Sequence, residues 1–274
     1  MIQRDRVVLL GHPVSHSLSP VMQNAALEAA GLELRYEAVD VMPESLGDLM
    51  TSLAEIPSAG NVTLPHKVAA FGLMSHRSDV AARVGAINTF WRQNDGGLYG
   101  DNTDVGGFLS FAEESLGVAP ANPRIAVIGA GGAAAAVLAA ASSWQGSTVR
   151  VHARNLHRAR NLCARFSDVA TVAPMAEEAV AYADIIVNAT PIGMTDDRHP
   201  VPLELLDRGA RVLDLVYRPG ETSWVRAARE KGHNAHDGLR MLLHQGAASF
   251  RRWFDIEPNT SAMWDALLRA CGRS

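Results

Sequence analysis

Three serines and two histidines precede the first predicted helix, in the segment GHPVSHSLSP. Ser17 and Ser19 lie between a strand and that helix, where free backbone N–H groups and the helix dipole favour a carboxylate or a phosphate. Helix capping by Ser19 is the simpler interpretation, but it leaves Ser17 unexplained. His12 and His16 are four residues apart. Pro13 disfavours a helical metal pair there and no third ligand is evident, so we expect no metal site.

A lysine and an aspartate could form a proton-transfer pair. Lys67 ends the segment NVTLPHK, directly after a strand and at the start of a predicted helix, where it would point into a cleft and donate a proton. A surface lysine is the alternative, but the helix dipole disfavours it. Asn88 lies in GAINT and Asp104 ends GDNTD, near the beginning of a second lobe. Each residue alone is typical of a turn or a cap, whereas together they favour a substrate site.

A strand, a glycine-rich turn and a helix follow one another from Arg124 onward. The turn has the pattern G-x-G-x-x-A, in which Gly129 permits a tight bend, Gly131 lets a pyrophosphate approach the backbone and Ala134 allows the helix to pack on the strand. The motif alone is weak, and a tight packing turn is the alternative. The flanking strand and helix favour a dinucleotide site.

The end of the next predicted strand indicates which dinucleotide is bound. An NAD site usually has Asp or Glu about 20 residues after the glycine turn, where it binds the ribose hydroxyls. This strand ends before Arg154 and Asn155, with Arg158 one turn later and no carboxylate among them. Two guanidinium groups can hold a 2′-phosphate, so the pattern favours NADP over a merely solvated basic helix face. No aromatic residues interleave the arginines, which disfavours nucleic-acid binding.

These residues need strands and helices that position them, and the alternation of short strand and helix patterns predicts an α/β fold with mainly parallel sheets. The expected strands of the first series are Val7–Gly11, Leu34–Val41, Gly60–Leu64, Ile87–Arg92 and Leu98–Tyr99. The expected helices between them are Pro20–Ala30, Glu44–Ala54 and Lys67–Leu73. The expected strands of the second series are Arg124–Ile128, Thr148–Ala153, Ala183–Ala189 and Val212–Val216.

Two lobes are expected, and the turn-rich residues 117–123 interrupt the pattern before the second series of strands begins. An N-terminal α/β substrate-binding lobe, residues 1–103, would be completed by C-terminal helices within residues 239–274. A Rossmann-type dinucleotide-binding domain, residues 104–238, would form the second lobe, with a cleft between the two. The expected connecting helices are Asp104–Ser115 and Leu239–Phe254, and the expected last helix is Thr260–Cys271.

Composition and charge exclude several classes of protein. The 274 residues are 47% hydrophobic and 20% charged, which is typical of a soluble globular protein rather than a disordered or fibrous one. A net charge of −4 does not indicate a nucleic-acid or membrane-surface protein. Cys163 and Cys271 form no metal or disulfide pattern, and the first residues lack a signal-peptide core, so we expect a cytoplasmic protein. The uncharged residues 125–149 are interpreted as a strand, turn and helix, not as a membrane span.

The local charge pattern is less even than the total. Between Ser115 and Ser167 the chain has six arginines and no Asp or Glu. This interval contains the glycine turn and the arginines that follow it.

Seven motifs, in this order, resemble those of the shikimate dehydrogenase family over nearly the whole chain: GHPVSHSLSP, NVTLPHK, GAINT, GDNTD, GAGGAA, NATPIGM and DGLRMLLHQGA. The resemblance implies a two-lobe enzyme that reduces 3-dehydroshikimate to shikimate with NADPH, on the route to chorismate and the aromatic amino acids. Lys67 and Asp104 match the catalytic pair. The residues that match the family's substrate site are Ser17, Ser19, Thr63, Asn88, Tyr217 and Gln245.

The cofactor site implied by the resemblance lies in the second lobe. It comprises Gly129, Ala130, Gly131, Gly132, Ala133, Arg154, Asn155, Arg158, Thr190 and Gly238. The family's arginine element reads N-R-T-x-x-R, whereas this chain has A-R-N-L-H-R, so two polar neighbours of the first arginine are replaced. Both arginines are kept, and the resemblance therefore still implies NADP.

Other functions stay open at this point. A paralogue that oxidises quinate or another cyclic polyol acid, with NAD, would keep the same skeleton. A non-catalytic dinucleotide sensor or a partner-binding protein could reuse the fold, although the joint presence of Lys67, Asp104 and Gln245 argues against it. The expected partners are small molecules, with no nucleic acid and no membrane, and the expected assembly is a monomer or a homodimer.

Overall fold

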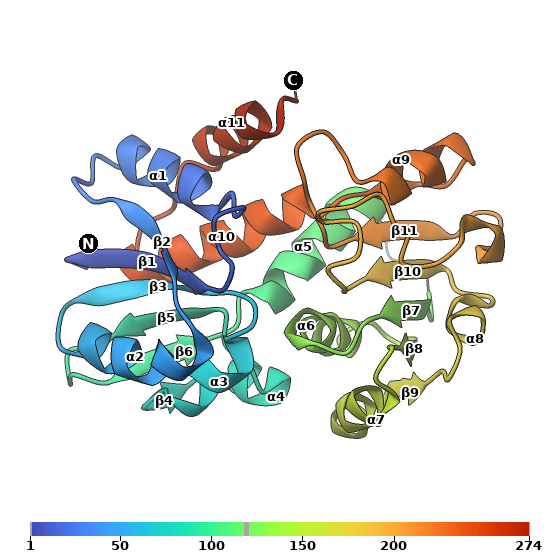
Figure 1. The fold of residues 1–274 in the computed structure, drawn as a ribbon, viewed down its shortest axis with the longest axis horizontal. Helices are drawn as coiled ribbons and strands as arrows, with labels where there is room; N and C mark the ends of the chain where they lie inside the picture. The colour runs from blue at the N-terminus through green and yellow to red at the C-terminus, as the bar shows by residue number, and fades with distance from the viewer. Residues whose placement is uncertain (1, 118–120, 274) are drawn as a thin grey trace. The chain divides into compact units, whose positions relative to one another are not determined.

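Two six-stranded sheets organise the chain, one in each of two units (Figure 1). The structure is a computed structural model, and it describes residues 2–117 and 121–273. The first unit comprises Met1–Gly107 and Leu242–Ser274, and the second comprises Phe108–Met241. The predicted α/β class is confirmed.

The sheet of the first unit is mixed, with the strand order β2-β1-β3-β5-β6-β4. β5 runs antiparallel to both β3 and β6, so the expectation of a mainly parallel sheet fails at this edge. The cause is local: a tight turn around Gly96 joins β5 directly to β6, and such a short connection permits only antiparallel pairing. The strands are β1 (Arg6–Gly11), β2 (Tyr36–Asp40), β3 (Ser58–Val62), β4 (His76–Arg77), β5 (Thr89–Arg92) and β6 (Leu98–Asp101).

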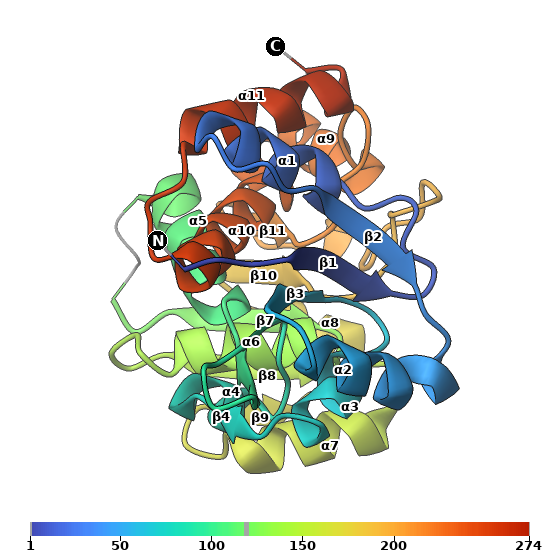
Figure 2. The ribbon, with the colours of Figure 1, turned by 90° about the vertical axis from the view of Figure 1, so that its left-hand side faces the viewer.

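Helices cover both faces of this sheet (Figures 1 and 2). They are α1 (Ser19–Ala29), α2 (Leu46–Ala54), α3 (Lys67–Gly72), α4 (Asp79–Val84), the second part of α10 (Leu239–Phe254) and α11 (Thr260–Cys271), with a short 3-10 turn at Pro43–Ser45. On one face, Val8 and Leu10 of β1 pack in one buried cluster with Met50 and Leu53 of α2. Because side chains alternate along a strand, Val7 and Leu9 face the other side, where α1 and α11 lie side by side.

The start of α1 differs from the expectation. The helix begins at Ser19, and Leu18 occupies the cap position without a side-chain cap hydrogen bond, so the prediction that Ser19 caps the helix is wrong. A turn closed by the Ser17 amide and the Val14 carbonyl already brings Leu18 into helical geometry. Ser17 Oγ therefore accepts the hydrogen bond from the Ser19 amide, at 3.2 Å. The helix ends at Ala29, one residue before its expected end at Ala30, and Gly31 follows in the left-handed conformation.

The sheet of the second unit is wholly parallel, with the order β12-β11-β10-β7-β8-β9. Its strands are β7 (Arg124–Ile128), β8 (Thr148–His152), β9 (Ala170–Val172), β10 (Ile185–Asn188), β11 (Arg211–Asp214) and β12 (Ala235–His236). The chain winds outward in both directions from β7, which is the doubly wound Rossmann topology. In this topology a ligand binds at the carboxyl ends of β7 and β10, where the strand order reverses.

Helices also cover both faces of the second sheet. They are the second part of α5 (Asp104–Leu116), α6 (Gly132–Ala141), α7 (Leu156–Arg165), α8 (Ala176–Val180), α9 (Ser223–Glu230) and the first part of α10, with a 3-10 turn at Leu203–Leu205. The uncharged residues 125–149 form β7, the glycine turn, α6 and the beginning of β8, as expected. Within residues 2–117 and 121–273, no helix is long and apolar enough to cross a bilayer.

The shortest strands were not predicted from the sequence. The two- and three-residue strands β4, β9 and β12 are too brief for an alternating pattern to develop. The predicted turn-rich segment, residues 117–123, lies partly outside the described residues, because 118–120 are not among them.

A buried carboxyl group ends β11. Asp214 is fully buried, and it accepts hydrogen bonds from the Val216 amide at 3.0 Å, Asn188 Nδ2 at 2.8 Å and Thr222 Oγ1 at 2.8 Å. Burial raises the pKa of Asp214 to about 7, although these hydrogen bonds act in the opposite direction. The folded protein therefore holds a proton on Asp214 at pH values where the unfolded chain has lost it.

This proton makes stability depend on pH. Since the folded state binds the extra proton between about pH 4 and pH 7, the free energy of unfolding falls as the pH rises through this window. The full effect is on the order of 4 kcal/mol. We expect Asp214→Asn to remove this slope, so that the stability of the variant relative to wild type increases with pH. Urea unfolding from pH 4 to 8 measures it, with Glu177→Gln at an exposed position of α8 as the control. A difference independent of pH would contradict the assignment.

Candidate active site

Lys67 and Asp104 form an ion pair at the carboxyl ends of two strands of the first sheet. Lys67 opens α3 after β3, and Asp104 opens α5 after β6. Lys67 Nζ lies 2.8 Å from Asp104 Oδ2, and the two side chains are only 18% and 7% exposed. In this position the lysine can give a proton as the ammonium and take one as the free amine, and the carboxylate fixes the direction of the group. Lys67 is one of two lysines in the chain, the other being Lys231.

Asn88 holds the other oxygen of the same carboxylate. Its Nδ2 lies 2.8 Å from Asp104 Oδ1, 2.9 Å from Thr103 Oγ1 and 3.1 Å from Gln245 Oε1. Its Oδ1 accepts from the Thr103 amide at 2.7 Å. Asn88 is buried. Through these hydrogen bonds its side chain orients Asp104 and links it to Gln245 of α10. Four of the predicted site residues, Lys67, Asn88, Asp104 and Gln245, are thus brought together.

A second layer of polar side chains lies beneath this group. Ser249 Oγ is 3.0 Å from Thr103 Oγ1 and 2.9 Å from Asn61 Nδ2. Asn61 Nδ2 also donates to the Asn88 carbonyl at 3.0 Å, and Asn61 Oδ1 accepts from the Tyr36 hydroxyl at 2.9 Å. All of these side chains are buried. These hydrogen bonds hold the segments that carry Asn88 and Thr103 in place. Because the buried polar groups have partners, the free-energy cost of burying them stays low.

The other expected substrate residues of the first unit also follow β1 and β3. Ser17 and Ser19 are adjacent through the amide–hydroxyl bond already described, and Ser19 is buried. Thr63 follows β3 and is half-buried, and its amide donates to the Leu10 carbonyl at 2.8 Å. Since neighbouring parallel strands end at the same edge of a sheet, the segments that carry these residues begin at the edge after which Lys67 lies.

The glycine turn of the second unit has the backbone geometry that a diphosphate needs. Gly129 has φ +125°, and a Cβ atom there would lie 2.6 Å from the Ala189 carbonyl oxygen, so only glycine fits. Gly131 takes the cap position of α6 without any side-chain cap, and space is open around its Cα. The N–H groups of the first turn, at Gly132, Ala133 and Ala134, are therefore free to bind an anion. Ala130 lies between the two glycines.

The arginines between Ser115 and Ser167 include some that are bound by protein groups and some that are not. Arg124 pairs with Asp184, and Arg150 donates to two backbone carbonyls. The exposed side chains of Arg154 and Arg158 make no hydrogen bond or ion pair with any residue in the described ranges. Asn155 caps α7, because its Oδ1 accepts from the Arg158 amide at 3.1 Å.

Thr190 belongs to a rigid turn after β10. Asn188 Oδ1 accepts from the Thr190 amide at 3.0 Å and from Thr190 Oγ1 at 2.6 Å, while Asn188 Nδ2 donates to Asp214. Gly238 precedes α10, and a Cβ atom there would lie 2.3 Å from the Leu215 carbonyl oxygen. Tyr217 is half-buried two residues beyond Leu215. These residues occupy the loops at the carboxyl ends of β10, β11 and β12.

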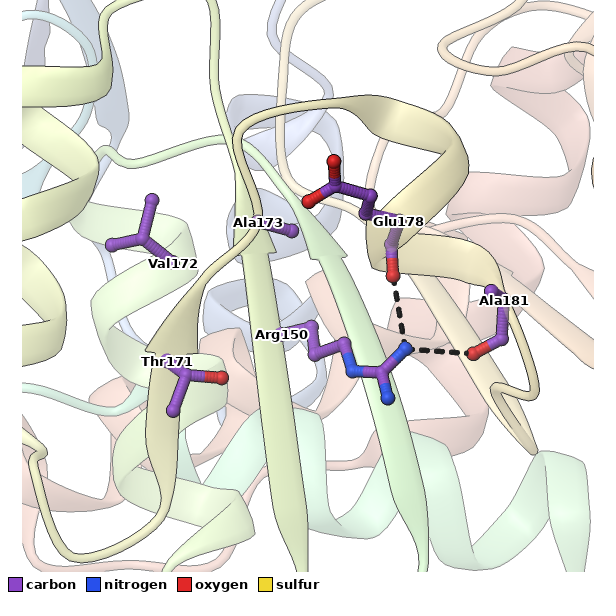
Figure 3. A pocket seen from close by; sticks show the side chains of 6 residues that line it. All are labelled: Arg150, Thr171, Val172, Ala173, Glu178 and Ala181. Atoms are coloured by element: carbon purple, nitrogen blue, oxygen red, sulfur yellow. Dashed lines mark hydrogen bonds between the residues drawn. The ribbon is translucent and has the colours of Figure 1, made fainter.

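A separate hollow of the second unit lies beside β8, β9 and α8 (Figure 3). In it the Arg150 guanidinium points at the carbonyl groups of Glu178 and Ala181, each 3.0 Å from Nη1. The side chain thus caps the end of α8. The hollow contains none of the residues expected to bind a dinucleotide.

The described residues contain no group of three or more His, Cys, Asp or Glu side chains placed to hold a metal ion. Of the two N-terminal histidines, His12 pairs with Asp40, with 2.5 Å between Nδ1 and Oδ1. His16 is exposed.

Sequence reasoning missed the residues that support the site rather than form it. Ser249, Thr103, Asn188 and Asp214 were not among the expected site residues. Ser249 follows Gln245 by four residues and so shares its helix face, which is a signal that could have found it. Asn188 and Asp214 both end a strand of the parallel sheet, and this position could have drawn attention to them.

Comparison with known families agrees with the fold. The family model described as the shikimate dehydrogenase substrate binding domain matches residues 9–90. The model described as shikimate / quinate 5-dehydrogenase matches residues 110–193, and the one described as the shikimate 5'-dehydrogenase C-terminal domain matches residues 238–268. Together the three models match well over half of the chain.

Individual relatives agree over almost their whole length. A protein of Rubrobacter xylanophilus named shikimate dehydrogenase (NADP(+)) is 45% identical over 95% of this chain and 94% of its own. One of Methylocella silvestris with the same name is 42% identical over 97% of this chain and 96% of its own. The crystal structure of shikimate 5-dehydrogenase from Thermus thermophilus in complex with NADP(H) and shikimate is 40% identical, covers 97% of this chain and 99% of its own, and superposes with a TM-score of 0.86. The chain belongs to the shikimate dehydrogenase family.

Proposed function

We propose that this protein is an NADP-dependent shikimate dehydrogenase, which reversibly reduces 3-dehydroshikimate to shikimate on the route to chorismate and the aromatic amino acids. The observation that carries the proposal is the buried ion pair of Lys67 and Asp104, at 2.8 Å, among hydrogen-bonding groups suited to a polyol ring. The family membership and the names of the relatives support it.

The proton chemistry belongs to Lys67. In the reduction, negative charge develops on the oxygen of the ring ketone, and Lys67 donates the proton that neutralises it. Asp104 accepts a hydrogen bond from Lys67 Nζ and so aims the ammonium group. In the reverse direction Lys67 takes the proton from the ring hydroxyl. No covalent intermediate is required.

The remaining residues of the first unit bind and orient the substrate. Ser17 and Ser19 hold the carboxylate of the ring acid, and Thr63 and Gln245 bind ring hydroxyls. In this proposal Asn88 acts chiefly by orienting Asp104 and Gln245, because its amide already reaches both side chains.

The second unit fits NADP. The uncapped start of α6 supplies N–H groups for the diphosphate, and among the described residues Arg154 and Arg158 have no partner that would compete with a 2′-phosphate. When bound, NADPH supplies the hydride. We assign Asn155, Thr190 and Gly238 to the walls of this site, and Tyr217 to the substrate. Substrate binding by residues 1–103 with 239–274, and cofactor binding by residues 104–238, stay predictions of this assignment.

Quinate oxidation with NAD is the second candidate, since one matching family model covers both acids. Two features favour shikimate and NADP over it. The serine pair is complete, and no carboxylate stands after β8 to bind the ribose hydroxyls of NAD. Cys163 and Cys271 are buried and are not joined in a disulfide, which fits work in a reducing compartment such as the cytoplasm.

Turnover with both acids and both dinucleotides tests the function. We expect kcat/KM to be highest for shikimate with NADP. Higher kcat/KM for quinate with NAD would favour the second candidate. Absence of turnover with both acids would exclude the proposed dehydrogenase activity and favour a binding protein.

Removal of the lysine amine tests the proton donor. We expect Lys67→Ala to lower kcat by about 10²- to 10⁴-fold with little change in KM, because general acid catalysis is lost while the binding groups remain. Steady-state kinetics in both directions measure it. Lys231→Ala removes the other lysine, an exposed one, and serves as the control. An unchanged kcat for Lys67→Ala would remove Lys67 from the mechanism.

The arginines after β8 test the cofactor preference. Each of Arg154→Ala and Arg158→Ala should raise KM for NADPH about 10- to 100-fold, the size of a lost charge-assisted hydrogen bond, and leave KM for NADH nearly unchanged. Arg160→Ala, an exposed arginine on the same helix, is the matched control. Equal effects on both dinucleotides would show that the two side chains do not read the 2′-phosphate.

A further inference from the structure

One face of α10 contacts the segment that carries Asp104 and the residues beside it. Gln245, Ser249 and Arg252 are spaced by four and three residues, so their side chains share this face. Gln245 reaches Asn88, Ser249 reaches Thr103, and Arg252 reaches Asp101. Proposed substrate binding accounts for Gln245, and Ser249 belongs to the polar layer beneath the ion pair, which leaves Arg252 without an assigned role.

The contact of Arg252 is made to a buried charge. Asp101 is the last residue of β6, and its side chain is only 6% exposed. Arg252 Nε donates to Asp101 Oδ2, while Ser78 Oγ and the Asn102 amide donate to Oδ1. Arg252 is the cation paired with Asp101 in the described structure. Without it, the Asp101 carboxylate would be buried and uncompensated, which is strongly unfavourable.

The turn from Asp101 to Asp104 is short and internally bonded. Asn102 Nδ2 donates to the Ala86 carbonyl at 3.0 Å, and Asn102 Oδ1 accepts from the Asp104 amide at 3.1 Å. A displacement of Asp101 is therefore passed through Asn102 to the backbone of Asp104, whose carboxylate lies on Lys67.

We propose that Arg252 is a positioning residue for the Lys67–Asp104 pair, which it holds in place by neutralising Asp101 at the base of the turn. The inference rests on the proposed function only for its catalytic readout. Arg252 bonds to Asp101 and to the Ala248 carbonyl of its own helix, so it acts through the turn and not on the substrate. The alternative is a bond that only stabilises the packing of α10 on the first sheet.

The first experiment compares kinetics. Arg252→Met should lower kcat for shikimate about 10- to 100-fold, the cost of a small misplacement of reacting groups, and leave KM for NADPH unchanged. Arg252→Lys keeps a cation near Asp101 and should recover most of the loss. Arg251→Met is the matched control, because this neighbouring arginine pairs with exposed Glu257. If Arg252 only stabilises the fold, Arg252→Met will have a lower Tm, but its kcat per folded molecule will equal that of Arg252→Lys.

The second experiment does not require turnover. Acylation with acetic anhydride, followed by mass spectrometry of the peptides, compares Lys67 with Lys231 in the same molecule. The ion pair with Asp104 and burial slow acylation of Lys67. Arg252→Met should displace Asp104 and so raise the labelling of Lys67 several-fold relative to Lys231. Arg251→Met should not change this ratio. Asp101→Asn combined with Arg252→Met removes both charges, and the double variant should lose less kcat than the sum of the two single effects in free energy.

The outcomes separate the two proposals. Unchanged kcat and unchanged Lys67 labelling in Arg252→Met would overturn the positioning role while leaving the dehydrogenase intact. If the wild-type protein does not turn over shikimate, the proposed dehydrogenase function is excluded. The ratio of Lys67 to Lys231 labelling would still show whether Arg252 positions the ion pair. A kcat loss equal in Arg252→Met and Arg252→Lys, with no change in labelling, would leave only a packing role.

Discussion

Lys67 and Asp104 are two opposite charges that the first unit holds largely out of water. Removing such charges from water costs several kcal/mol each, and their attraction repays this only when the remaining oxygens and protons also find partners. Asp104 meets the condition because Asn88 occupies its second oxygen and Asn102 holds its amide. The buried hydrogen bonds around the pair are thus a condition of its existence. They also give it a single geometry, which proton transfer requires.

The proposed cofactor site of the second unit depends on the opposite condition, hydrogen-bond donors and positive charges without protein partners. A site for a polyanion must leave donors and positive charge unsatisfied, and the uncapped start of α6 and the side chains of Arg154 and Arg158 are unsatisfied in the described structure. Other arginines of the same acid-free interval, such as Arg124 and Arg150, are occupied by protein groups. The asymmetry explains why a net charge of −4 conveys so little, since the relevant charge is local.

Local signals explain which parts could be predicted from sequence. The glycine turn, the limits of α10 and the limits of β8 depend on neighbouring residues, and the structure matches the predictions to within one residue. The start of α1 could not be predicted, because a turn ahead of Leu18 decides it. The antiparallel β5 follows from a short connection that resembles any other turn. Ser249 and Thr103 are 146 residues apart, and no periodicity relates positions so distant.

The packing of α10 explains how such distant residues meet in register. Trp253 is buried, its ring stacks on Tyr36 with 5.8 Å between centroids, and its Nε1 donates to Thr89 at 2.9 Å. This large side chain sets the rotation of the helix about its axis, because a different rotation would open a cavity in the core. Ser249 and Arg252 are fixed by the same rotation. The hydrophobic core of the first unit therefore decides where the polar groups beneath the ion pair can lie, and core packing and site geometry are one constraint.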